Sequence, residues 1–255
     1  MLASTDPQIP HQDLTYLYDS MGNRTRTVEN GVVTDYTANN LNQYSQAGGK
    51  AFVFDDDGNL VRETVNQSVS SFSFDHDNRL ISVGKSSEVW QYAYNALGRL
   101  TKRTSGTSNM EAIVDPVGMG SVVSEYDTLS NVTSRHDHGL GLVSTRDGGD
   151  NFVGYTFDSV GSVQQLVNAN GLVMNEYAYA PFGEAFRSTE SISNPLRFVG
   201  QFGVRAEPYG HDFMGARLFS APEGRFTSAD PLRTQDTVIS AECLRLLLKP
   251  TDCIR

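Results

Sequence analysis

The histidines of the segment His136-Asp137-His138 are the residues whose type and spacing best suit metal chemistry. Two imidazoles at a spacing of two residues lie on one face of a strand, where both could bind the same ion. A zinc site needs further protein ligands, and none can be assigned from the sequence. Surface-loop histidines are the more common explanation, so we predict neither a metal nor any other cofactor.

The segment Asp55-Asp-Asp57-Gly58-Asn59 invites comparison with a calcium-binding loop. With Gly58 as the sixth loop position, the first and twelfth positions are Val53 and Thr64, and neither is a carboxylate. The surrounding pattern also recurs in parts of the chain that lack clustered acids. We therefore predict that these acids cap a turn and do not bind calcium.

Trp90, Tyr92 and Tyr94 could form a stacking platform for a sugar ring. At a spacing of two residues the three rings share one face of a strand, so the sequence favours burial in a core. Cys243 and Cys253 could pair after export or remain as free thiols, and the sequence leaves both alternatives open. No phosphate-binding glycine loop, His-Glu-x-x-His motif or Gly-x-Ser-x-Gly motif is found.

A repeated unit must position most of these residues. It has two aromatic rings two residues apart, then Asp or Asn, then Gly followed by Asn or Arg and an apolar residue. The first copies begin, with an average step of 19 residues, at Tyr16, Tyr36, Phe52, Phe72 and Tyr92. Later copies begin at Tyr155 and Tyr177.

The spacing within each unit predicts a strand, a tight turn and a second strand. Rings two residues apart share one face of a strand, and these core rings are Tyr16, Tyr18, Phe52, Phe54, Phe72, Phe74, Tyr92, Tyr94, Tyr177 and Tyr179. The Asp or Asn accepts hydrogen bonds from the turn, and Gly supplies its left-handed position. These structural turn residues are Asp19, Gly22, Asp55, Gly58, Asp75, Asn78, Asn95, Gly98, Asp158, Gly161 and Gly183. A hairpin cannot bury its rings alone, so successive units must join into one sheet.

The composition favours an all-β chain. Four Lys and 11 Glu stand against 23 Gly, 16 Asn and 19 Asp, which disfavours helices and favours turns. The formal net charge of −10 argues against a nucleic-acid partner. No apolar run approaches the ~20 residues of a membrane span, and the first residues lack a signal-peptide pattern.

The repeated unit resembles the YD repeat of the Rhs family. The segments 114–127, 139–143 and 157–183 resemble the Rhs-associated core region, and Asn194-Pro195-Leu-Arg-Phe198-Val-Gly200-Gln201 and Gly224-Arg225-Phe226-Thr-Ser-Ala-Asp230-Pro231-Leu232 are similar to its closing signature. Together the motifs cover roughly residues 16–232. The chain departs from the family at Ala180, where Asp is usual, and at 218–220, where the family has Tyr-Tyr-Asp.

In this family, YD repeats curl into a hollow β-sheet shell, a core region seals one end, and a variable C-terminal segment, commonly a toxin, is enclosed. The resemblance implies antiparallel hairpins that form part of such a shell. It implies as partners an upstream YD-repeat shell, a C-terminal toxin cargo and secretion-system components. It also implies a secreted or cell-surface location, as in secretion-system effectors, Tc toxin B and C subunits and teneurin ectodomains.

We expect five regions along the chain. They are a polar leader at 1–15, YD repeats at 16–105, degenerate repeats and loops at 106–150, the core region as a plug at 151–232, and a divergent tail at 233–255. In the tail, an apolar cluster from Cys243 to Lys249 predicts a short helix that Pro250 ends.

Asp230, with Glu223 and Arg225, is the catalytic candidate that the resemblance implies, because the family's core region is linked to aspartate-dependent self-cleavage. Two acids must share a proton in this chemistry, and the family's second Asp-Pro-x-Gly-Leu motif does not follow Asp230. We therefore expect a turn and an ion pair here, and no self-cleavage. Intact mass spectrometry should find 28.0 kDa after days at neutral pH. A fragment that accumulates and is absent in Asp230→Asn would contradict this.

The leading functional hypothesis is a non-enzymatic fragment of an Rhs shell that encapsulates or presents a toxin-like cargo. One alternative is an aspartyl self-protease that releases the segment after residue 232. A second alternative is a cell-surface module that binds carbohydrate or mediates adhesion through exposed rings, Trp90 among them.

Overall fold

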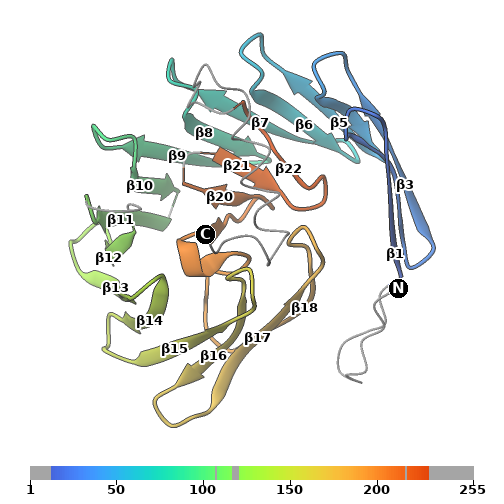
Figure 1. Ribbon diagram of the computed structural model, residues 1–255. Coiled ribbons are helices and arrows are strands. Elements are labelled where there is room, and N and C mark those ends of the chain that lie inside the picture. The colour runs from blue at the N-terminus through green and yellow to red at the C-terminus, as the bar shows by residue number, and fades with distance from the viewer. Residues whose placement is uncertain (1–12, 107, 117–120, 216, 230–255) are drawn as a thin grey trace, which may run out of the picture.

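The computed structural model describes residues 13–106, 108–116, 121–215 and 217–229. Eighteen strands form one antiparallel sheet that curls around the later part of the chain (Figure 1). Each strand pairs with its neighbours in sequence, as in a string of hairpins. The predicted antiparallel all-β fold is confirmed. The predicted tail at 233–255, with its helix and both cysteines, lies outside the described residues.

The strands of the large sheet are β1 (Leu14–Tyr18), β2 (Arg24–Glu29), β3 (Val32–Ala38), β4 (Tyr44–Ala47), β5 (Lys50–Phe54), β6 (Leu60–Val65), β7 (Ser68–Phe74), β8 (Leu80–Lys85), β9 (Glu88–Tyr94), β10 (Leu100–Ser105), β11 (Ser108–Val114), β12 (Val122–Tyr126), β13 (Val132–His138), β14 (Leu142–Asp147), β15 (Phe152–Phe157), β16 (Val163–Asn168), β17 (Val173–Tyr179) and β18 (Ala185–Glu190). The inner elements are η1 (Gly200–Phe202), β19 (Arg205–Ala206), β20 (Asp212–Met214), β21 (Arg217–Ser220) and β22 (Arg225–Phe226).

Two kinds of turn alternate along the sheet because the repeat carries two turn signals. The longer turn follows the ring pair: Asp55 O accepts from Gly58 N at 3.1 Å, and Asp55 N donates to Asn59 O at 2.9 Å. The shorter turn has two residues, as at Asn66 and Gln67, whose φ values are 46° and 74°. Positive φ at both positions matches the right-handed twist of the flanking strands.

Asparagine side chains connect the longer turns to one another. Asn59 Nδ2 donates to Asn78 Oδ1 at 2.9 Å, and Asn23 Nδ2 donates to Asn42 Oδ1 at 3.1 Å. Asn59 is buried, and its Nδ2 also donates to Asp55 Oδ2. Each bond satisfies a polar group that would otherwise cost free energy in the interior. In these two places, neighbouring turns are therefore held together by side chains as well as by backbone pairing.

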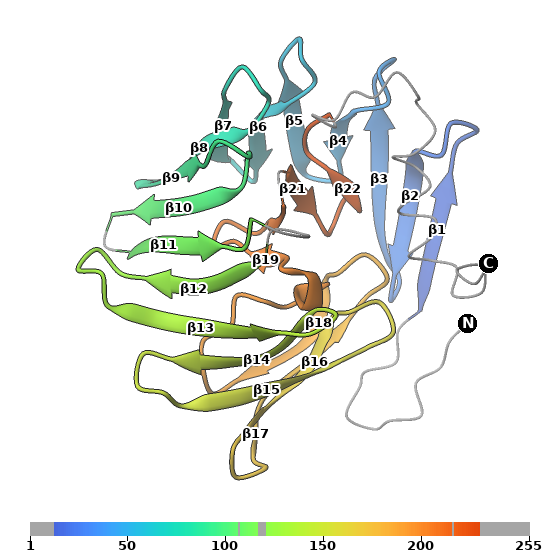
Figure 2. The ribbon, with the colours of Figure 1, turned by 60° about the vertical axis from the view of Figure 1, so that its left-hand side comes forward.

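Residues 191–229, which we call the inserted segment, lie on the inner face of the curled sheet (Figure 2). They contain η1 and a four-stranded antiparallel sheet of β19–β22. The predicted plug began at residue 151, but β15–β18 are part of the large sheet. These strands keep the repeat's alternation of rings, so they pair as wall strands. The chain turns inward only after Glu190.

The main core forms where the inserted segment meets the wall. It consists of Leu60, Phe72, Leu80, Val83, Trp90 and Tyr92 from the wall and Tyr209, Phe213 and Leu218 from the inserted segment. The rings of Tyr92 and Phe213 stack with centroids 6.0 Å apart. Apolar burial of this kind is the dominant favourable term in folding. The inserted segment therefore supplies the second layer that the ring-bearing face of the sheet requires.

The two ends of the large sheet approach each other without pairing. β1 pairs only with β2, and β18 pairs only with β17, among the described strands. The ring of Tyr16 on β1 nevertheless meets the ring of Phe182 in the β17–β18 turn, with centroids 5.4 Å apart. The Arg24 guanidinium lies 3.9 Å from the centroid of Phe182. Aromatic and cation–π contacts thus hold this seam.

Candidate functional site

The inserted segment is anchored to the wall by buried carboxylates, and the first of them is Glu207. Its side chain is fully enclosed, and its Oε2 accepts from Arg103 Nη1 on β10 at 2.8 Å. The Tyr92 hydroxyl donates to the same oxygen at 3.1 Å and lies 2.8 Å from the Tyr209 hydroxyl. Burial, followed by the charge of Glu207, raises the pKa of Tyr92, so the phenol stays protonated.

A second anchor joins Glu223 in the inserted segment to Lys50 on β5, with Nζ and Oε1 2.8 Å apart. Ser220 donates a short hydrogen bond to the other oxygen of Glu223. Burial raises the pKa of the neighbouring Glu63. Burial also lowers the pKa of His211 to about 4, so this imidazole is neutral at physiological pH. The single positive charge of Lys50 thus offsets Glu223 inside the protein.

The third anchor joins Arg205 on β19 to Glu125 on β12. Arg205 Nη1 contacts Glu125 Oε1, and His136 Nε2 lies 3.5 Å from the same oxygen. Burial alone would raise the pKa of Glu125, but the charge of Arg205 and the contacts with His136 together lower it to about 2. The Glu125 carboxylate is therefore ionised at neutral pH.

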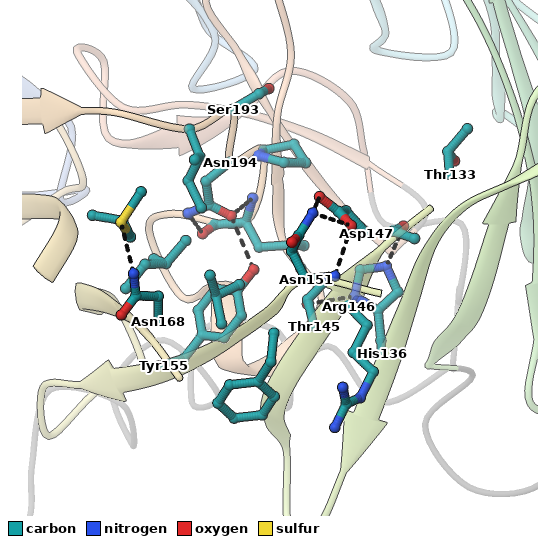
Figure 3. A pocket seen from close by; sticks show the side chains of 18 of the residues that line it. Thr133, His136, Thr145, Arg146, Asp147, Asn151, Tyr155, Asn168, Ser193 and Asn194 are labelled. Atoms are coloured by element: carbon teal, nitrogen blue, oxygen red, sulfur yellow. Dashed lines mark hydrogen bonds between the residues drawn. The ribbon is translucent and has the colours of Figure 1, made fainter. Parts of the chain in front are cut away.

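Beside this third anchor lies a cavity of about 910 Å³ between strands β12–β17 and the start of the inserted segment (Figure 3). Its wall includes the side chains of His136, Thr145, Tyr155 and Asn194. The arginines at its wall are in ion pairs: Arg205 with Glu125, Arg103 with Glu207, and Arg146 with Asp150. The Asp147 carboxylate at the same wall accepts from the Asn151 amide and from the backbone N–H of Gly149. The cavity is therefore polar, and its wall does not favour an anionic ligand.

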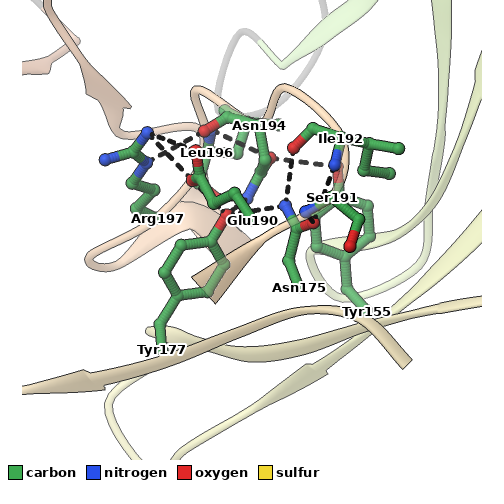
Figure 4. A network of polar contacts seen from close by, with 9 residues as sticks. All are labelled: Tyr155, Asn175, Tyr177, Glu190, Ser191, Ile192, Asn194, Leu196 and Arg197. Carbon is green, nitrogen blue, oxygen red and sulfur yellow. Dashed lines mark hydrogen bonds and ion pairs between the residues drawn. The ribbon is translucent and has the colours of Figure 1, made fainter. Parts of the chain in front are cut away.

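A hydrogen-bonded network fixes the point at which the chain leaves the sheet (Figure 4). Asn175 Oδ1 accepts from the backbone N–H groups of Ser191 and Ile192, at 2.9 and 3.1 Å. Its Nδ2 donates to the Tyr177 hydroxyl at 2.9 Å and to Ile192 O at 2.8 Å. Arg197 forms an ion pair of 2.9 Å with Glu190. Asn175 thus replaces the strand partner that the chain loses as it turns inward.

The catalytic candidates implied by the resemblance lie apart or outside the described residues. Glu223 is occupied by Lys50 and Ser220. Arg225 donates to Asn42 O and to Asn23 Oδ1, the latter at 3.0 Å, and stacks over the Tyr44 ring. No hydrogen bond or ion pair joins Glu223 to Arg225 in the part of the chain that the structure describes. Asp230 lies outside that part.

The predicted turn residues occupy equivalent places in the longer turns. The left-handed positions, with φ from 57° to 99°, are Gly22, Gly58, Asn78, Gly98, Gly161 and Gly183. The side chains that accept from turn backbone N–H groups include those of Asp19, Asp55, Asp75, Asn95 and Asp158. Ala180, where the family usually has Asp, keeps the backbone part of the turn, since its O accepts from Gly183 N at 3.0 Å.

The predicted core rings differ in burial. Buried rings are Phe72, Tyr92 and Tyr177, and half-buried rings are Tyr16, Phe52, Phe54, Phe74, Tyr94 and Tyr179. Tyr18 corrects the prediction, because its side chain is 50% exposed at the end of the edge strand β1. Among the described strands, β1 has a neighbour on one side only, so none of them covers its last ring. Trp90 is 4% exposed and contacts Tyr209, which leaves no free ring face for a sugar.

Sequence reasoning missed the anchoring residues Arg103, Glu125, Arg205 and Glu207. A signal for two of them was present, because Arg103 and Glu125 fall on the inward-facing positions of their strands. Arg103, for example, lies directly opposite Tyr92. A charged residue at a position that the repeat otherwise gives to a ring or an aliphatic side chain needs a buried partner. Their partners Arg205 and Glu207 belong to no repeat.

Within the described ranges, no group of three or more His, Cys, Asp or Glu side chains is arranged to hold a metal ion. The ring nitrogens of His136 contact Glu125 and Thr145, and His138 Nε2 contacts Val122 O at 2.9 Å. None of the described residues forms a helix long and apolar enough to cross a membrane.

Residues 4–244 match the family described as the teneurin YD-shell. The chain belongs to the teneurin YD-shell family. The resemblance to YD-repeat proteins is thereby confirmed, and the curled sheet of hairpins is the structure of a YD-shell wall. The inserted segment is then the part of this YD-shell chain that packs inside the wall.

Two curated relatives are similar to this YD-shell chain along most of its length. The tRNA3(Ser)-specific nuclease WapA of Bacillus spizizenii is 25% identical over 237 residues, which are 87% of this chain and 10% of that protein. The tRNA nuclease WapA of Bacillus subtilis is 25% identical over 236 residues, with the same two shares. The YD-shell chain thus spans about a tenth of the length of these relatives.

Solved structures that are similar include the crystal structure of TcdB2-TccC3-TEV. Its TM-score is 0.46 and its sequence identity 14%, over 86% of this chain and 16% of that chain. The crystal structure of TcdB2-TccC3 without its hypervariable C-terminal region has a TM-score of 0.34 and 12% identity, over 88% of this chain and 18% of that chain.

Proposed function

We propose that this chain is a structural section of a YD-repeat shell that encapsulates or presents a toxin-like polypeptide connected to its C-terminal end. The observation that carries the proposal is the anchoring of the inserted segment inside the wall by three buried carboxylates, Glu125, Glu207 and Glu223. An anchor of this kind fixes where a following polypeptide starts. The match covers about a tenth of two relatives that are named as tRNA nucleases. This is consistent with a shell section that is joined to a separate part with its own activity.

The last described part of the inserted segment directs the chain along the inner side of the wall. Thr227 O accepts from Leu60 N of β6 at 2.8 Å, and Thr227 N donates to Leu218 O at 2.9 Å. Backbone bonds on both sides hold this stretch between wall and inserted segment. A polypeptide that continues from here begins at the inner face, where it is screened by the surrounding hairpins.

The proposed function implies three partners and a location. Further YD repeats would pair with the edge of β1 that no other described strand covers, because backbone N–H and C=O groups at a strand edge can accept another strand. The enclosed polypeptide is the second partner. Secretion-system components would carry the assembly, and its place of action would be outside the cell or at the cell surface.

Neither alternative function is favoured by the geometry. Self-cleavage by two aspartates needs a second acid beside the first, and Glu223 already binds Lys50. Carbohydrate binding through Trp90 needs an exposed ring, and this ring packs in the core.

A fusion experiment tests the proposal with the full chain. An unstructured reporter with several trypsin sites is attached after Arg255, and the same reporter is attached before Met1 in a matched control. We expect trypsin to cut the C-terminal reporter several-fold more slowly than the N-terminal one under native conditions. The two rates should become equal in denaturant. Equal rates in the folded fusions, with circular dichroism showing intact β structure, would overturn the proposal.

A further inference from the structure

The wall of the large cavity contains a hydroxyl, an imidazole and a carboxylate in line. Glu125, His136 and Thr145 lie on the adjacent strands β12, β13 and β14, and His136 is paired directly with Thr145. Thr145 Oγ1 lies 3.0 Å from His136 Nδ1, and His136 Nε2 lies 3.5 Å from Glu125 Oε1. A hydroxyl and a base within hydrogen-bond reach, with a third group orienting the base, is the arrangement of an activated nucleophile.

The charge of Glu125 decides which ring nitrogen carries the proton. The carboxylate is ionised, since the contacts with Arg205 and His136 outweigh burial and lower its pKa to about 2. An ionised oxygen near Nε2 favours a hydrogen on that nitrogen. Nδ1 is then the acceptor, and the Thr145 hydroxyl donates to it. Ser134 Oγ, 3.2 Å from Nε2, can accept from the same N–H.

The space in front of Thr145 is suited to an uncharged substrate. All three residues line the cavity of about 910 Å³, together with Tyr155 and Arg205. The arginines at its wall are in ion pairs, and the Asp147 carboxylate at the wall repels an anion. Arg205 Nε is a buried donor with no hydrogen-bond partner within the described residues. A buried donor without a partner is costly, and a carbonyl oxygen that accepted from it would relieve that cost.

We propose that Thr145, His136 and Glu125 form an acyl-transfer site that hydrolyses small uncharged esters. The Thr145 oxygen attacks the ester carbonyl carbon, and the hydroxyl proton passes to His136 Nδ1. The C–O bond to the alcohol breaks, and the alcohol leaves with that proton. Water then attacks the acyl-Thr145 ester, again giving a proton to Nδ1, and the acid is released with the Thr145 hydroxyl restored. Glu125 is the positioning residue that stabilises the charged imidazole.

The test uses the full chain with p-nitrophenyl acetate as the probe. We expect p-nitrophenol release above the buffer rate, and peptide mapping after an acid quench should find an acetyl group on Thr145. Thr145→Ala should lose both, and His136→Gln should lower the rate by about a hundredfold. Thr145→Ser should retain activity. Thr101→Ala, at an outward position on β10, is the matched control and should leave the rate unchanged.

Two results would overturn this site. One is a parent rate equal to that of buffer. The other is p-nitrophenol release that continues unchanged in Thr145→Ala, which would show that another group reacts. Circular dichroism and the melting temperature of Thr145→Ala establish that the variant is folded. The shell function is unaffected by either result, because it is measured by the reporter fusions.

Discussion

Arg103 and Glu207 form an ion pair in which the carboxylate has no exposed surface, and this pair joins the wall strand β10 to the inserted segment. Their atoms lie 2.8 Å apart, and Glu207 Oε1 has no hydrogen-bond partner within the described residues. The Glu207 carboxylate is shielded from solvent, so Arg103 and the Tyr92 hydroxyl are the groups that compensate its burial. Removing either partner should affect the docking of the whole inserted segment.

Arg103→Met should lower the free energy of unfolding by about 3–5 kcal/mol, because it leaves a buried carboxylate unpaired. The control is the neighbouring Lys102→Met, which breaks an exposed pair with Glu111 and should cost at most about 1 kcal/mol. Urea unfolding followed by circular dichroism measures both. Equal losses for the two variants would show that Arg103 is not an anchor.

Gly98→Val should destabilise the chain by about 1–3 kcal/mol, because Gly98 has a φ of 71°. A Cβ at this position would contact nothing within 4 Å, so the loss comes from the backbone alone. Gly98→Asn is the matched variant, because Asn78 takes the same place in its turn with a φ of 57°. It should cost only a few tenths of a kcal/mol. A melting temperature of Gly98→Val equal to that of the parent would refute the strain argument.

Asp212 should make stability fall as the pH rises from about 4 to 7. Burial raises the pKa of this carboxyl from 3.8 to about 7, although Arg197 opposes the rise. Between these values the folded state holds a proton that the unfolded state releases, so the free energy of unfolding decreases with pH until about pH 7. Asp212→Asn should remove this part of the slope, while the exposed Asp57→Asn should retain it. Urea titrations at several pH values measure the slopes, and identical slopes in parent and Asp212→Asn would contradict the assignment.

The free edges of β1 and β18 should make the isolated chain self-associate at tens of micromolar (~10⁻⁵ M), because unpaired strands template further pairing. Leu17→Lys places a charge on β1 and should increase the monomer fraction. Leu140→Lys, in the β13–β14 turn, is the control and should change nothing. Size-exclusion chromatography with light scattering measures the mass. A single monomer peak for the parent would argue against the open-edge explanation.

The repeat made the wall predictable because each hairpin is built from local signals. A ring pair, an acid and a left-handed Gly within one unit determine strand, turn and strand whatever follows. The same signal wrongly predicted that the ring of Tyr18 is buried. Burial of a ring also requires a neighbouring strand on each side, and β1 pairs only with β2 among the described strands. It also misplaced the start of the inward segment, since residues 152–190 were assigned to the plug although they carry the wall pattern.

The anchors and the cavity site could not be predicted in the same way. Glu125 forms an ion pair with Arg205, and Arg103 forms one with Glu207. The two members of each pair are far apart in the sequence, and no residue spacing predicts such a contact. In the sequence, the spacing of His136 and His138 draws attention to a metal motif, although none is predicted there. Its actual partners are Thr145 on the next strand and Glu125 on the previous one. Cross-strand partners follow from register, which the weaker turn signals between 106 and 150 did not define.

The inserted segment contacts strands far apart on the circumference, from Arg24 on β2 through Lys50 on β5 and Arg103 on β10 to Glu125 on β12. These contacts can all form only if the wall has the present number of hairpins between β2 and β12. A repeat array can ordinarily gain or lose a unit, because each unit touches only its neighbours. Here a duplicated or deleted hairpin between β2 and β12 would displace the wall residues on one side of it by two strands relative to those on the other side. The inserted segment could then no longer contact both groups of wall residues. These contacts therefore constrain the number of hairpins between β2 and β12, whereas hairpins added beyond β1 would leave them unchanged.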